Sequence, residues 1–107
     1  MQDSACQQPT DAGVRWVVKD MAVTHADCHR ILPALIPGRA PDWHGAVACW
    51  QWADRWVRVS LGEEGERRIA SLRLPRTRVR LEASGLDEQQ WQRLVADFDR
   101  RFQRGGG

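Results

Sequence analysis

Two histidines and a cysteine lie close together in the sequence and carry side chains that bind zinc or a similar ion. His25, Cys28 and His29 fall on neighbouring turns of a predicted helix, and His44 or Cys49 could approach them. Cys28, however, falls on the apolar stripe of that helix, where a free cysteine acts as a small hydrophobe. The tight paired-cysteine spacings of structural zinc modules do not occur in the sequence. We therefore expect no metal site and no cofactor.

Residues that could serve an enzyme as nucleophile or acid–base pair are scattered along the chain. Cys49 lies in the middle of a predicted strand and faces an arginine, which would favour the thiolate. The sequence has neither a phosphate-binding glycine loop nor a serine in a nucleophile-elbow motif. Glu63, Glu64 and Glu66 cluster in a predicted turn, where solvated carboxylates are the ordinary finding. We therefore expect a protein without enzymatic activity, and a small thiol- or metal-dependent enzyme is the alternative.

An arginine-rich segment that contains a tryptophan is the first candidate for a binding surface. Between Arg55 and Glu82 the sequence has eight arginines and four glutamates, a local charge of +4. If the apolar residues of the strands face the core, the other face carries Trp56, Arg58, Arg73, Arg78 and Arg80. Guanidinium groups beside an aromatic ring suit phosphate contacts and base stacking. The other interpretation is a solvated sheet face, on which arginine is common, and a one-residue shift of register would exchange the two faces.

Tryptophan is the second candidate, because the chain has six tryptophans and no tyrosine. Trp91 and Trp50 are assigned to the core, the first by its place at the start of a helix and the second by cross-strand pairing. Trp43, in a predicted loop, and Trp56, on the predicted wet face, are harder to bury. Exposed tryptophans are enriched where proteins bind one another, so they favour binding of a protein partner or self-association.

The elements that must position these residues follow from the spacing of apolar residues. Strands are predicted over 14–19, 46–52, 55–61, 67–74 and 77–83. The first helix begins at a Thr24–Asp27 capping pair and is interrupted by Pro33, and a loop covers 38–45. The second helix begins at an Asp87–Gln90 capping box, and the glycines 105–107 end it.

The resulting order, β-α-β-β-β-β-α, predicts an α+β fold: a five-stranded, mostly antiparallel sheet with two helices packed on one face. We expect residues 1–13 to be a flexible tail, residues 14–104 to form one domain, and residues 105–107 to be flexible. At 107 residues, a single domain with its own core is the usual arrangement.

Composition limits the class of protein. The chain is 42% hydrophobic and 28% charged, as in an ordinary globular domain, and its net charge of +2 is too small to identify a nucleic-acid binder. We find neither an apolar run long enough to span a membrane nor a secretory signal. Cys6, Cys28 and Cys49 are an odd number without paired spacing, so we expect reduced thiols in a cytoplasmic protein.

These observations predict a small non-catalytic binding module that uses the open face or the edge of its sheet. The expected partner is another protein or a second copy of the chain. The alternative is nucleic acid or another polyanion, bound by the arginines and Trp56 of the open face.

Overall fold

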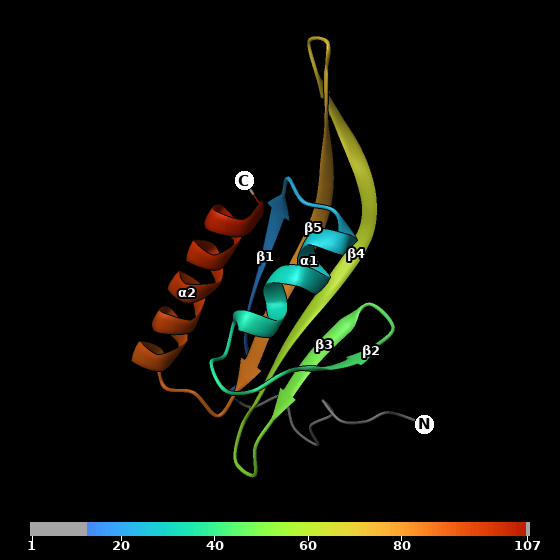
Figure 1. Ribbon diagram of the computed structural model, residues 1–107. Helices are drawn as coiled ribbons and strands as arrows, with labels where there is room; N and C mark the ends of the chain where they lie inside the picture. The colour runs from blue at the N-terminus through green and yellow to red at the C-terminus, as the bar shows by residue number, and fades with distance from the viewer. Residues whose placement is uncertain (1–12, 107) are drawn as a thin grey trace.

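A computed structural model describes residues 13–106 of the chain. It contains one sheet of five antiparallel strands, in the order β1-β5-β4-β3-β2, and two helices that lie on the same face of this sheet (Figure 1). The strands are β1 (Arg15–Met21), β2 (Asp42–His44), β3 (Val47–Gln51), β4 (Trp56–Ile69) and β5 (Leu72–Ser84). The helices are α1 (His25–Ile31), continued by the short 3₁₀ helix η1 (Leu32–Ala34), and α2 (Glu88–Gly106). The predicted α+β fold is therefore confirmed.

The helices begin where their capping residues predict. The Thr24 hydroxyl accepts from the backbone N–H of Asp27, and the Asp27 carboxylate accepts from the backbone N–H of Thr24. Asp87 and Gln90 exchange the same two kinds of bond at the start of α2. Pro33 lies in η1, so the helix changes from α to 3₁₀ where the proline removes a backbone donor.

The core lies between the helices and the sheet face that they cover. Val57, Val59 and Leu61 of β4 and Val79, Leu81 and Ala83 of β5 supply the buried side chains at the centre of the sheet. The helices contribute Cys28, Ile31, Leu32, Phe98 and Phe102. Trp50, assigned to the core by cross-strand pairing, is buried and pairs with Val57, so alternation along the central strands identified the buried face correctly.

Strands β4 and β5 differ from the prediction, because they form one long hairpin. The segment 62–65, predicted as a turn, continues β4 through a β-bulge between Leu61 and Glu64. Pro75, predicted to start a connection, lies within β5 opposite Glu66. A proline is tolerated there because β1 ends opposite Thr77, which leaves this part of β5 at the edge of the sheet. The fifth strand is instead β2, in a segment that we predicted to be a loop.

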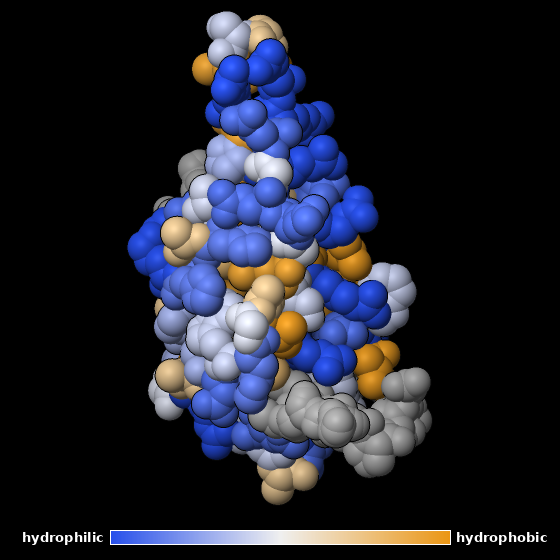
Figure 2. All heavy atoms as spheres, turned by 90° about the vertical axis from the view of Figure 1, so that its right-hand side faces the viewer, coloured by the Kyte–Doolittle hydropathy of each residue, from blue (hydrophilic) through white to orange (hydrophobic). Residues whose placement is uncertain are grey.

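The distal part of this hairpin forms an arm. Between Leu72 and Arg76, β5 pairs only with β4. This two-stranded ribbon extends away from the helices to a turn at Ala70 and Ser71 (Figure 1). In the space-filling view the arm is mostly hydrophilic, with apolar atoms at its tip (Figure 2). Ile69 and Leu72, which pair beside the turn, are 48% and 61% exposed.

The ends of the chain lie partly outside the described residues. The predicted tail covers residues 1–13, of which only Gly13 is described. The predicted stop at the C-terminal glycines is displaced, because α2 continues to Gly106.

Candidate functional site

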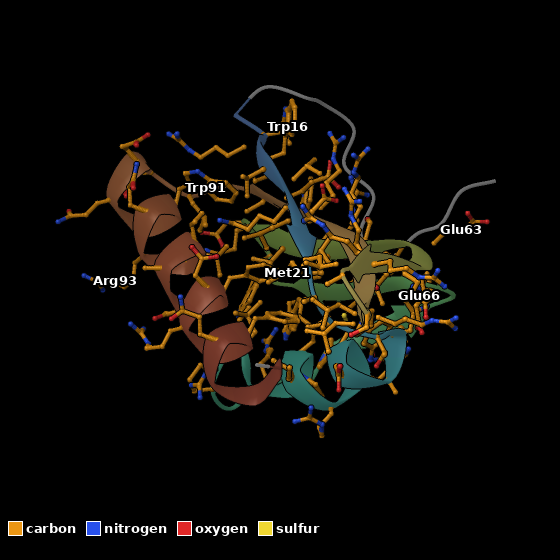
Figure 3. All side chains as sticks on the ribbon, turned by 90° about the horizontal axis from the view of Figure 1, so that it is seen from above. Trp16, Met21, Glu63, Glu66, Trp91 and Arg93 are labelled. Carbon is orange, nitrogen blue, oxygen red and sulfur yellow. The ribbon has the colours of Figure 1, made fainter. Side chains whose placement is uncertain are left out.

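The face of the sheet opposite the helices, here called the outer face, carries the predicted arginine cluster. The strand register assigns to it Trp16, Val18 and Asp20 of β1, Arg76, Arg78, Arg80 and Glu82 of β5, and Trp56, Arg58 and Ser60 of β4. Trp16 projects from β1 on the side away from the helices, whereas Trp91 projects from α2 towards the sheet (Figure 3). Antiparallel strands place alternate side chains on opposite faces, so the outer face is assembled from every second residue.

Four of the five predicted site residues meet on this face, and Arg73 does not. Trp56, Arg58, Arg78 and Arg80 lie together, because Arg58 pairs with Glu82 and Arg80 with Ser60. Arg73 has the parity of Val79 on the continuous strand β5, so it points to the other face, opposite Arg68 on the arm. The prediction for Arg73 was wrong because it treated 67–74 and 77–83 as separate strands. The face on which Arg73 lies was then not fixed by the alternation along 77–83.

Two carboxylates neutralise much of the arginine charge. Glu82, which is 8% exposed, lies 2.8 Å from Arg58 Nε and 3.1 Å from Arg80 Nε. Asp20 lies 2.9 Å from Arg76 Nη2 and 3.5 Å from Arg78 Nε. The hydrogen bond from Arg76, with the charges of both arginines, holds the pKa of Asp20 below its usual value. These four arginines are thus already held by protein carboxylates.

Two of these four guanidinium groups also lie over tryptophan rings. Arg58 lies over the Trp56 ring at 4.7 Å and Arg80 over the Trp16 ring at 4.5 Å, both within cation–π range. We expected Trp56 to be hard to bury, but it is only 2% exposed. Among the described residues, its indole N–H finds no hydrogen-bond acceptor. Trp56 is therefore a packed residue of the outer face and not a free stacking platform.

The exposed apolar side chains of the described residues share one face. They are Trp16 (57% exposed), Val18 (39%), Ile69 (48%) and Leu72 (61%), all on the outer side by register. Trp16 and Val18 are consecutive outward residues of β1 and form a patch at the edge of the sheet. The sequence analysis did not predict this patch, although alternation along β1 places Trp16 and Val18 on the same face. Strand order, which places β1 at the edge, was not available from the sequence.

The histidines and cysteine of α1 have structural partners. His25 Nε2 donates to the carbonyl oxygen of Gly62 over 2.6 Å, and the His29 ring stacks on Trp43 at 3.9 Å. Burial raises the pKa of the Cys28 thiol to about 11, so it is protonated at neutral pH. The part of the chain that the structure describes has no group of three possible metal ligands. His25, Cys28 and His29 therefore each have a role in the packing of the fold.

Cys49 is disulfide-bonded, which corrects our expectation of reduced thiols. Cys28 is the free, buried cysteine of the described residues, and Cys6 lies outside them. An odd number of cysteines does not prevent one pair from forming. The expectation of a reduced thiol is therefore wrong for Cys49 and correct for Cys28.

An apolar groove of about 400 Å³ lies on the helix side of the molecule, between η1, the β3–β4 turn and the start of α2. Leu35, Pro37, Trp52 and Leu86 are among its lining residues, and none of the lining residues is a cysteine or histidine. The groove therefore offers apolar contact but neither a thiol nor an imidazole.

Comparisons of the chain with known protein families, with curated proteins and with solved structures find no match. Within residues 13–106 no helix is long and apolar enough to cross a membrane.

Proposed function

We propose that this protein is a non-catalytic binding module that holds a protein partner at β1 and the adjoining outer face. The observation that carries the proposal is the exposure of Trp16 and Val18 on a regular edge strand. Neighbouring apolar side chains at a sheet edge are typical of a surface that a partner covers.

The backbone of β1 supports this assignment. All seven residues of β1 pair with β5 without a register shift, and within the described sheet β1 has no neighbour on its other side. Natural proteins protect such edges with short strands, prolines, bulges or inward charges. The opposite edge strand, β2, has only three residues. The two inward basic residues of β1 are both paired, Arg15 with Glu88 at 2.7 Å and Lys19 with Asp99 at 3.1 Å, and neither proline nor bulge interrupts the strand.

The electrostatics of the outer face favour a protein over a polyanion. A nucleic-acid phosphate would compete with Asp20 or Glu82 for the arginines, and a base would compete with guanidinium groups for Trp16 and Trp56. Binding through phosphate contacts depends on positive charge that is available to release counterions. We therefore favour a protein partner over a polyanion.

The state of the cysteines bears on both the compartment and the absence of catalysis. The disulfide at Cys49 leads us to propose an oxidising compartment instead of the cytoplasm. Cys28 is buried with a raised pKa, which is the opposite of an activated thiol. His25 and His29 are occupied by Gly62 and Trp43. These features support a role without covalent chemistry.

Selection from a library of displayed random peptides tests the proposal. Recovered peptides should bind the wild type, and Trp16→Glu should weaken this binding about tenfold or more, as expected for loss of a tryptophan anchor. Leu72→Glu is the matched control, because Leu72 is as exposed as Trp16 on the same face but lies on the arm. The proposal would be refuted if the peptides bound Trp16→Glu as tightly as the wild type, or if Trp16→Glu and Leu72→Glu weakened binding equally.

Titration with mixed-sequence oligonucleotides at low and moderate salt tests the polyanion alternative. We expect no saturable quench of tryptophan fluorescence. A quench that fades as salt rises and is lost in an Arg78→Glu, Arg80→Glu variant would assign the outer face to a polyanion instead.

A further inference from the structure

We infer that the partner at the β1 edge is a second copy of this chain, with the two β1 strands paired antiparallel about a two-fold axis at Val18. The two five-stranded sheets would then form one continuous sheet of ten strands. This inference rests on the proposed function and specifies the partner of the same surface. Such an interface is isologous, because each copy contributes the same residues.

The symmetry limits the possible registers. Residues directly opposite one another in an antiparallel pair point to the same side, so outward residues must face outward residues. A two-fold axis perpendicular to the sheet therefore passes between two copies of a single residue. The residues near the middle of β1 that can occupy the axis are Val17 and Val18.

Charge distinguishes these two registers. With Val17 at the axis, Arg15 would face Lys19 of the second copy, twice in each dimer. Like charges directly opposite in a sheet are destabilising. With Val18 at the axis, Arg15 faces Met21 of the second copy, and all seven residues of both strands are paired. The register centred on Val18 therefore combines full overlap with no directly opposed like charges.

The same register brings the exposed apolar patches of the two copies side by side. On the outer face, Val18 meets Val18 of the second copy, and the two Trp16 rings lie diagonally beside this central pair. Diagonal neighbours in a sheet are within reach of aromatic side chains. Trp16 also faces Asp20 of the second copy, whose charge is held by Arg76 and Arg78. The residues that are exposed in the single chain thus become the centre of the interface.

The inward side of β1 is compatible with this pairing. Arg15 is held by Glu88 of α2 at 2.7 Å, and Lys19 by Asp99 of α2 at 3.1 Å. When Val17 faces Lys19 of the second copy, each lysine retains this carboxylate, and its aliphatic stem packs against the valine. The new strand pair therefore leaves neither basic side chain without its carboxylate.

Cysteine crosslinking tests the register. Directly opposite residues of an antiparallel pair have Cα atoms about 4.5–5.5 Å apart, a distance that a disulfide spans. Under mild oxidation we expect Val18→Cys to form a covalent dimer and Val17→Cys not to do so. Ser60→Cys, on the outer face of β4, is the control for random collision. Cys28 will not interfere, because it is buried. Crosslinking through Val17→Cys, or equally through Ser60→Cys, would overturn the inference.

The mass in solution provides a test that needs no variant. Sedimentation equilibrium of the wild type should give twice the chain mass of 12.2 kDa, Val18→Glu should give the single mass, and Leu72→Glu should still give twice the mass. A monomeric wild type at every soluble concentration, or a dimer that survives Val18→Glu, would overturn the inference. If the wild type is monomeric but displayed peptides still depend on Trp16, the proposed function stands and only the second copy is wrong. If the peptides ignore Trp16 as well, both fail.

Discussion

Gly85 lies where the end of β5 meets the β3–β4 turn, and replacing it with alanine gives a sharp test of this packing. The residue has φ +89°, in the left-handed region that side chains avoid. A Cβ atom at this position would lie 2.5 Å from the carbonyl oxygen of Asp54 and 2.7 Å from the Cβ of Arg55. The first of these neighbours is backbone, so the turn or the start of the α2 connection must shift.

Two contributions set the expected loss of stability for Gly85→Ala. The left-handed backbone costs an alanine about 1–2 kcal/mol, and the forced displacement of a packed backbone adds about 1–3 kcal/mol. We therefore expect a decrease of about 3 kcal/mol in the free energy of unfolding. Gly38→Ala is the matched control, because Gly38 has φ +81° and open space within 4 Å. It should cost only the conformational part, about 1–2 kcal/mol.

Urea unfolding followed by tryptophan fluorescence measures both variants. The slope of the free energy with urea should be unchanged, so that the shift in midpoint reports stability directly. If Gly85→Ala and Gly38→Ala lose the same stability within experimental error, the β3–β4 turn does not pack against Gly85.

Two further predictions concern polar contacts. The buried Thr77 hydroxyl donates to the Val23 carbonyl oxygen over 2.7 Å, so Thr77→Val should cost about 1–3 kcal/mol in the same urea assay; an unchanged midpoint would show that this bond contributes nothing. The hydrogen bond from the Thr24 backbone, with that from Arg30, lowers the pKa of Asp27 below 3.8, so the charged form stabilises α1 above that pH and the contribution is lost as pH falls through the folded-state pKa. Thermal melts between pH 5 and pH 3 should therefore show a smaller decrease in Asp27→Asn than in the wild type, and equal slopes would contradict this assignment.

The amino-acid sequence by itself determined the local elements and the buried face. Both capping pairs, at Thr24 and at Asp87, begin the predicted helices, because the bonds involved span only three residues. Alternation along β4 and β5 identified Val59 and Leu81 as core, because the apolar residues of a strand must share the face that the helices cover. The same alternation brought Arg58 and Arg80 to the opposite face.

The tertiary structure decided which residues of that face remain available. Arg73 lies on the other face because one long strand, instead of two short ones, fixes its orientation relative to Val79. Trp56 is buried beneath Arg58, whose place on β4 beside Glu82 of β5 is set by strand pairing. The exposure of Trp16 follows from the place of β1 at the edge of the sheet. Pairing between strands far apart in the sequence is set by the whole core. The spacing of apolar residues within one strand does not determine which strand lies beside it.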